Sequence, residues 1–105
     1  MNWIYLALAG LFEIGWPVGL KMAQAPASRI SGILVAITFM AVSGTLLWLA
    51  QRTIPIGTAY AIWTGIGAAG TFIVGVLIYN DPASLMRFAG VALIVAGVVT
   101  LKLAH

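Results

Sequence analysis

Charged residues are scarce in this sequence of 105 residues. Only 7% of the chain is charged, with five Lys and Arg against two Asp and Glu, while 63% is hydrophobic. Soluble domains carry about 25% charged residues and are roughly half apolar. A small soluble fold also leaves a large fraction of its surface in water. These proportions exclude a small soluble domain and predict a chain whose solvent is lipid.

Several other features are missing. Cysteine is absent, which excludes disulfides and thiolate metal sites. The single histidine is the terminal His105, so the sequence offers neither a cluster of metal ligands nor a catalytic triad. The net charge of +3 comes from scattered residues rather than a basic patch, which argues against nucleic acid as a partner. We expect no enzymatic activity, metal or cofactor.

The hydrophobic residues form four continuous runs separated by short polar segments around Pro26, Pro55 and Pro82. A membrane-spanning helix needs about 20 residues, whereas a membrane barrel strand would alternate apolar and polar residues. Ser28 is expected to cap the second helix, and Asp81 to cap the last helix with Pro82 as its first residue. We predict one all-α domain over residues 1–105, an up-down-up-down bundle of four transmembrane helices at about 3–23, 30–50, 56–79 and 84–103.

This topology places both termini on one face of the membrane. The balance of Lys and Arg near the span ends normally sets the orientation of such a bundle. Here the terminal side holds Arg52 and Lys102, and the opposite side holds Lys21, Arg29 and Arg87. The near equality predicts that copies insert in both directions. A chain of dual topology can form an antiparallel dimer within the membrane lipid.

Glu13 is the most informative residue, because it lies near the middle of the first predicted span. Ionisable side chains at that depth are costly and mark functional sites by default, although a protonated structural carboxyl is the alternative. Burial disfavours the charged form of a carboxyl group, and a nearby cation or donor favours it. A carboxyl group on which these two opposing influences are balanced can exchange a proton for a cation, as an antiporter requires. Trp16 lies three residues on and shares roughly the same helix face.

The third span carries two aromatic residues and a series of glycines. Tyr60 and Trp63 offer π-faces and polar hydrogens suited to a cation beside a carboxylate, although Tyr60 alone could be an interfacial anchor. Gly65, Gly67 and Gly70 match the dinucleotide-binding pattern G-x-G-x-x-G. We reject that match, because no βαβ unit surrounds it. The glycines instead favour a helix bend or close helix packing.

The second and fourth spans contribute fewer signals. Ser43 is a hydroxyl in an apolar span, and such hydroxyls often bond only to the preceding helical turn. Gly90 and Gly97 are seven residues apart on one helix face, which favours close packing against a second copy or within the bundle. Lys102 is interpreted as a snorkelling anchor, with a role in the site as the alternative.

Together these residues resemble the small multidrug resistance family over essentially the whole chain. The resemblance rests on the four-helix length, Glu13, the segment PIGTAYAIW at 55–63, the GIG at 65–67, and the glycines at 90 and 97. Within that family, EIGW at 13–16, GLK at 19–21 and LK at 101–102 are similar to the guanidinium-exporter subtype.

The resemblance implies an antiparallel, dual-topology homodimer in the bacterial plasma membrane that exports guanidinium ion in exchange for protons. Glu13 of both subunits would form the shared proton and substrate site. The resemblance also implies roles for other residues: Trp16, Ser43 and Trp63 as supports of Glu13, Tyr60 as a gate, Gly65 and Gly67 as a helix bend, and Gly90 and Gly97 as dimer contacts.

Some positions depart from the family pattern. Pro17 stands where the subtype usually has alanine, the first loop at 25–29 is atypical, and Gly44 replaces a bulkier residue. These departures leave the substrate range open. The alternatives are a proton-coupled multidrug exporter of quaternary ammonium or lipophilic cations, and a structural or lytic membrane protein.

Overall fold

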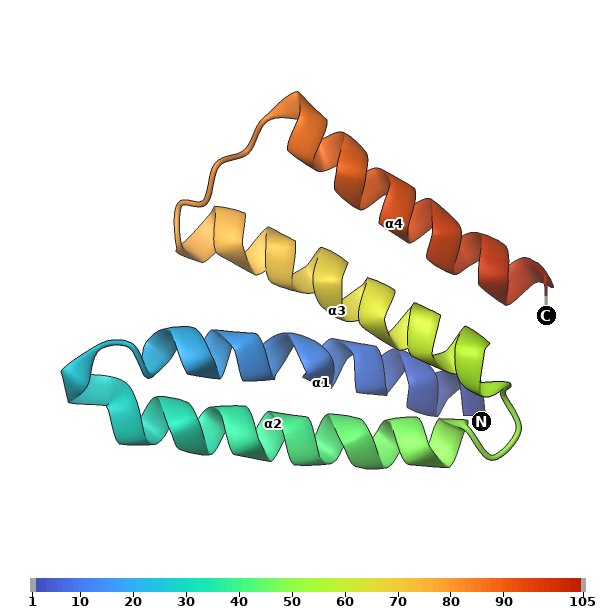
Figure 1. Cartoon of the computed structure of the whole chain (residues 1–105), viewed down its shortest axis with the longest axis horizontal. Helices are drawn as coiled ribbons and strands as arrows, with labels where there is room; N and C mark the ends of the chain where they lie inside the picture. Colours follow the sequence, from blue (N-terminus) through green and yellow to red (C-terminus); the bar gives the residue numbers. More distant parts are fainter. Residues whose placement is uncertain (1, 105) are drawn as a thin grey trace.

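The computed structural model describes residues 2–104 as four helices, with no strand in that range (Figure 1). All four helices are long and apolar enough to cross a membrane, which confirms the predicted four-helix class. Consecutive helices run in opposite directions (Figure 1). The elements are α1 (Asn2–Met22), the short 3-10 helix η1 (Pro26–Ser28), α2 (Arg29–Ala50), α3 (Ile56–Ile78) and α4 (Leu85–Ala104).

The start of α4 differs from the sequence prediction. The helix begins three residues after Pro82, and the hydroxyl oxygen of Ser84 accepts a 3.2 Å hydrogen bond from the backbone N–H three residues on. Asp81 belongs to the end of α3 instead, because its N–H donates to the Gly75 carbonyl oxygen at 3.0 Å. Asn80 makes this return possible with a left-handed φ of 56°. The prediction that Asp81 and Pro82 begin the last helix was therefore wrong.

The cap of α2 also differs. Ser28 precedes α2 as predicted, but its side chain makes no capping hydrogen bond. Its hydroxyl donates to the Met22 carbonyl oxygen at 2.7 Å, because η1 turns the serine back against the end of α1. Ser28 thus closes α1 rather than capping α2.

The helices α1 and α2 form the tightest pair. A Cβ atom added at Gly19 would lie 2.6 Å from the backbone nitrogen of Ala36 and 2.8 Å from the Gly32 carbonyl oxygen. Only glycine allows this backbone approach, which small residues make possible between membrane helices. Helix α3 packs against α1 on another face, where a Cβ at Gly10 would lie 2.7 Å from Ile66. Helix α1 is therefore the central element that positions the other two.

A small apolar core lies at the end of the bundle that holds the chain termini and the α2–α3 connection (Figure 1). The buried side chains are Leu6, Ala50, Ile54, Ala59 and Ile62.

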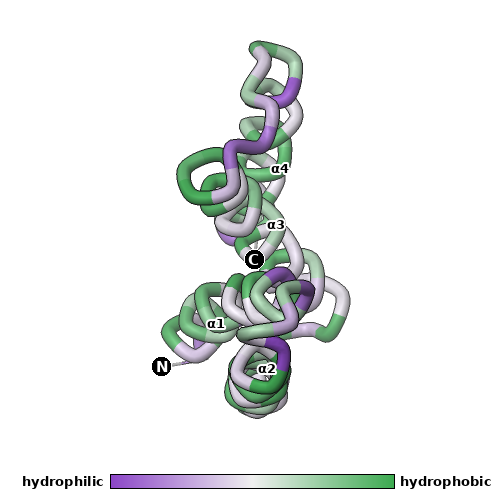
Figure 2. The backbone as a smooth tube through the Cα atoms, turned by 90° about the vertical axis from the view of Figure 1, so that its left-hand side faces the viewer, coloured by the Kyte–Doolittle hydropathy of each residue, from purple (hydrophilic) through white to green (hydrophobic). Residues whose placement is uncertain are grey.

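Helix α4 packs mainly against α3, and none of its residues is buried. Figure 2 looks along the helices and shows α3 and α4 stacked beyond α1 and α2. The chain is correspondingly flat, with extents of 45 × 34 × 17 Å. Its accessible surface of 6549 Å² exceeds the roughly 5,600 Å² that scaling with mass gives for a compact protein of 11.0 kDa. Helix α4 therefore contacts the rest of the chain on one side only and leaves most of its surface exposed.

Candidate functional site

Glu13 lies in the middle of α1, on the side that faces α3. A Cβ atom at Gly67 would lie 2.5 Å from Cγ and 3.1 Å from Cβ of this glutamate. The missing side chain at position 67 is thus what gives the glutamate room against α3. The glutamate is half-buried and therefore remains partly accessible.

Ser43 brings α2 and α3 to the same point. It is fully buried, and its Oγ accepts a 2.8 Å hydrogen bond from Trp63 Nε1. The same Oγ lies 2.7 Å from the Ala9 carbonyl oxygen and 3.5 Å from Glu13 Oε1. The structure therefore brings Glu13, Ser43 and Trp63 together from three helices.

The Ser43 hydroxyl has only one proton to donate. At 2.7 Å the Ala9 carbonyl oxygen is the better acceptor, and 3.5 Å to Glu13 Oε1 is long for a hydrogen bond. A hydroxyl oxygen has two lone pairs, of which Trp63 uses one. The other lone pair can accept from a protonated Glu13, whereas an ionised Glu13 competes with Ala9 for the serine proton.

A groove of about 260 Å³ between α1 and α3 adjoins Glu13. Thr64 and Thr71 supply hydroxyl groups to its wall. Pro17, also in the wall, has no N–H, so the Glu13 backbone carbonyl lacks its normal intrahelical partner. Oxygen acceptors therefore outnumber fixed positive charges in this groove, which suits a small cation with N–H donors. The other lining residues are Gly67 and Ala68.

Trp16 and Tyr60 stand apart from the Ser43 hydrogen bonds. The Trp16 Nε1 atom is buried and has no hydrogen-bond partner among the described residues. Tyr60 is 55% exposed, and its ring lies against that of Trp63, with centroids 5.3 Å apart and an interplanar angle of 57°. Tyr60 thus connects Trp63 to the surface of the chain.

The remaining predicted residues have different surroundings. Helix α3 is continuous through Gly65 and Gly67, and a Cβ at Gly65 would lie 2.5 Å from Val98 of α4. A Cβ at Gly90 or Gly97 would meet no described atom within 4 Å. Lys102 is far from Glu13 along the bundle, with its Nζ 4.5 Å from the centroid of the Trp3 ring. That contact fits the interpretation of Lys102 as an anchor.

Sequence reasoning missed three contributors to this site. It did not identify the Ala9 carbonyl as an acceptor, since a backbone oxygen leaves no trace in residue type. It also missed Thr64 and Thr71. Their spacing from Gly67, three and four residues, is the helical signal that could have placed them on the Glu13 side of α3.

Comparisons with known proteins identify the family of this chain. The chain matches the family model of the Small Multidrug Resistance protein over residues 1–94. It is 50% identical over 103 residues to a guanidinium exporter of Salmonella typhimurium, covering 98% of this chain and 97% of that protein. A guanidinium exporter of Escherichia coli K12 is 48% identical with the same coverage. One from Yersinia pseudotuberculosis is 46% identical over 104 residues, 99% of each chain.

Proposed function

Because the chain belongs to the small multidrug resistance family, we propose that this multi-pass membrane protein exports guanidinium ion in exchange for protons. The observation that carries the proposal is the half-buried carboxyl of Glu13, set in mid-membrane beside Ser43. The relatives are named exporters, which supports transport rather than catalysis. The membrane would be the bacterial plasma membrane.

The chemistry of the two ligands explains the exchange. Guanidinium is planar and presents N–H donors that pair with a carboxylate through two parallel hydrogen bonds. A protonated carboxyl group cannot hold the cation in this way. Proton and guanidinium therefore compete for Glu13, and a protein that exposes the site alternately to the two sides couples their gradients.

The Ser43 hydroxyl would adjust to each state of this cycle. With Glu13 protonated, the carboxyl hydrogen can be donated to Ser43 Oγ while the serine keeps its bond to the Ala9 carbonyl oxygen. With Glu13 ionised, the serine proton can turn toward the carboxylate. The Trp63 N–H holds Ser43 Oγ in place throughout. A fixed carboxylate favours the bidentate geometry that guanidinium needs.

Trp16 and Tyr60 would act around this centre. The buried Trp16 Nε1 is a donor without a partner in the described chain, so it is available to a carboxylate or to a second subunit. Tyr60, exposed and packed on Trp63, is placed to gate the site. Gly65 and Gly67 would permit α3 to change shape between the two open states.

We further propose that two copies form an antiparallel homodimer of dual topology. The support is helix α4, in which no residue is buried, the open space at Gly90 and Gly97, and the surface that exceeds that of a compact chain. A second α4 packed on these glycines would bury that surface. The near-equal Lys and Arg counts of the two ends are consistent with insertion in both directions. Each dimer would then hold two Glu13 carboxyls, with lipid around it.

Transport by purified protein in liposomes tests this function. We expect a substrate-induced current with guanidinium, loss of that current in Glu13→Gln, and little current with tetraethylammonium. If only the quaternary ammonium ion gives a current, the protein is a multidrug exporter rather than a guanidinium exporter. If the wild-type protein gives no current with either cation, the proposed transport function is wrong and a structural role is favoured.

A further inference from the structure

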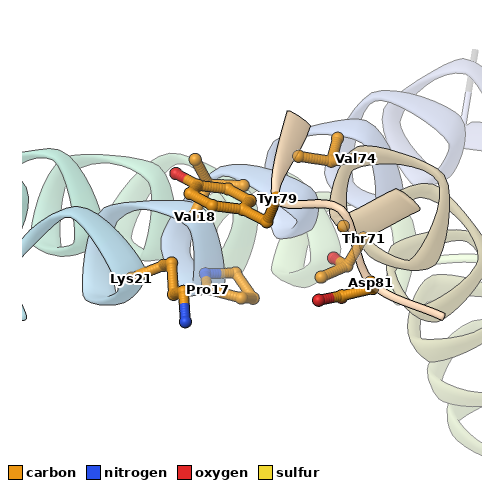
Figure 3. Close-up of a pocket in the computed structure, with 8 residues that line it drawn as sticks. Pro17, Val18, Lys21, Thr71, Val74, Tyr79 and Asp81 are labelled. Carbon is orange, nitrogen blue, oxygen red and sulfur yellow. The ribbon is translucent and has the colours of Figure 1, made fainter. Parts of the chain in front are cut away.

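A second pocket, of about 190 Å³, lies where α1 and α3 approach the α3–α4 connection. Figure 3 shows the Asp81 carboxylate and the Thr71 hydroxyl turned toward Pro17 of α1, with the Tyr79 ring beside Val18. The volume is many times what one water molecule needs. A cation of four heavy atoms therefore fits this pocket. Its other lining residues are Lys21, Val74 and Gly75.

This pocket adjoins the groove at Glu13. Pro17 and Thr71 line both hollows, so the two share walls from α1 and from α3. Eight residues separate Glu13 from Lys21, which corresponds to about 12 Å along a helix. A cation in this second pocket would therefore lie within about 12 Å of Glu13 along α1.

The charges at this end of the bundle give Asp81 a special position. Lys21, Arg29 and Arg87 all lie at this end, and Asp81 is the one acidic residue near them. Within residues 2–104 the Asp81 carboxylate has no hydrogen-bond or ion-pair partner. An approaching cation thus meets three positive charges and one free carboxylate.

The pocket already holds a positive group against its aromatic ring. The Nζ atom of Lys21 lies 5.9 Å from the centroid of the Tyr79 ring, within the range of a cation–π contact. The backbone also brings Asp81 into this position, because its N–H is bonded to the Gly75 carbonyl oxygen. The absence of a side chain at Gly75 makes room for Asp81 Oδ2.

From these contacts we propose that Asp81 and Tyr79 form an outer binding site for the transported cation, and that Lys21 competes for it. A planar guanidinium would pair with the Asp81 carboxylate and lie on the Tyr79 ring, displacing the lysine ammonium. The site would collect the cation at the membrane surface before it moves past Pro17 and Thr71 to Glu13. This inference rests on the proposed export of guanidinium.

The test compares the guanidinium concentration dependence of the current in Asp81→Asn and Lys21→Gln with that of wild type in liposomes. At low ionic strength we expect KM to rise about two- to fivefold in Asp81→Asn, the range of an exposed charge pair, with the maximal current kept. Lys21→Gln should lower KM, because it removes the competing cation. Asp81→Glu, which keeps the charge, should restore the wild-type KM. The differences should shrink at 1 M salt, where the Debye length is about 3 Å.

The opposite signs of the two variants separate binding from folding, since damage to the fold would lower the current of both. Tyr79→Leu adds an independent variant, for which we expect a raised KM from loss of the ring. A wild-type current with an unchanged KM in Asp81→Asn and Lys21→Gln would overturn the outer site and leave guanidinium export standing. A wild-type protein without guanidinium current would instead overturn the export function itself.

Discussion

Trp63 donates a 2.8 Å hydrogen bond from its indole nitrogen to the hydroxyl oxygen of Ser43, and this bond joins α3 to α2 beside Glu13. Two residues 20 positions apart in the sequence thus fix one oxygen atom in a membrane interior. In this bond Ser43 is the acceptor, so its own hydroxyl proton can still be donated, either to the Ala9 carbonyl oxygen or to the Glu13 carboxyl group. Both acceptors of the serine proton therefore lie beside one indole-bound oxygen atom.

Removing this hydroxyl should destabilise the fold as well as the site. Ser43→Ala leaves the partly buried indole N–H of Trp63 without this partner, and we expect a loss of about 1–2 kcal/mol in the free energy of unfolding. Trp63→Phe removes the donor instead. In the double variant the two losses should not add, with a coupling energy of about 0.5–1.5 kcal/mol. Unfolding in mixed micelles measures all three variants, and simple additivity would contradict the bond's importance.

Competition between protons and guanidinium predicts a pH dependence of transport. Under the proposed competition a higher proton concentration leaves less of the shared site to the cation, so the KM for guanidinium should rise as the pH falls. For one competing proton the rise is at most about tenfold per pH unit. Currents measured across a pH series at saturating and limiting guanidinium give this dependence. A KM that is independent of pH would contradict a shared site.

Gly67 should matter because of its contact with Glu13. In Gly67→Ala the added Cβ would lie 2.5 Å from Cγ of the glutamate, so the carboxyl group must move. We expect at least a tenfold loss of guanidinium transport with the helices intact by circular dichroism, since a small misplacement of a binding group is costly. Gly57→Ala is the matched control on the same helix, because a Cβ there meets nothing within 4 Å. Equal activity of the two variants would remove Gly67 from the site.

A substitution of Trp16 should affect guanidinium and quaternary ammonium ions differently. Its Nε1 is a buried donor without a partner in the described chain, suited to hold a carboxylate or a planar cation. Trp16→Gly should therefore abolish guanidinium current. If the protein instead exports quaternary ammonium ions, which have no N–H donors, transport of tetraethylammonium by this variant should change little.

The proposed dimer predicts a specific effect at Gly97. Gly97→Leu places a large side chain where the single chain has open space, so the subunit should fold normally. Two α4 helices could then no longer approach closely, and we expect a shift from dimer to monomer by light scattering in detergent, with loss of transport. Gly44→Leu is the control, because position 44 is also open but lies on α2. If Gly97→Leu remains a dimer, the dimer interface does not lie at Gly97 of α4.

The sequence pointed to several residues of the candidate site, because residue type carries that information. A carboxyl group in an apolar span identified Glu13, and the hydroxyl and indole of Ser43 and Trp63 were recognisable as polar groups out of place. The sequence could not pair them, since Ser43 alone looks like any serine bonded to its own helix. Their convergence depends on how three helices are rotated, which no spacing within one helix specifies.

The helix starts show the same limit at a smaller scale. Asp81 and Pro82 have the residue types of a helix start, yet Asn80 takes a left-handed φ and returns Asp81 to Gly75. Ser84, three residues later, supplies the cap. Local preference is worth only about 1 kcal/mol at such positions, so tertiary contacts decide between neighbouring candidates.

By itself the sequence determined the lipid environment, the four helices and the carboxyl at the centre of the first one. These follow from composition and from the length of apolar runs, because the bilayer sets the length of a spanning helix and the cost of a charge inside it. Only the tertiary structure decided which groups meet that carboxyl and that Asp81 lines one pocket with Tyr79 and Lys21. The reason is that glycines at 19, 67 and 75 set how closely backbones and side chains approach, and such contacts exist only once the helices are packed.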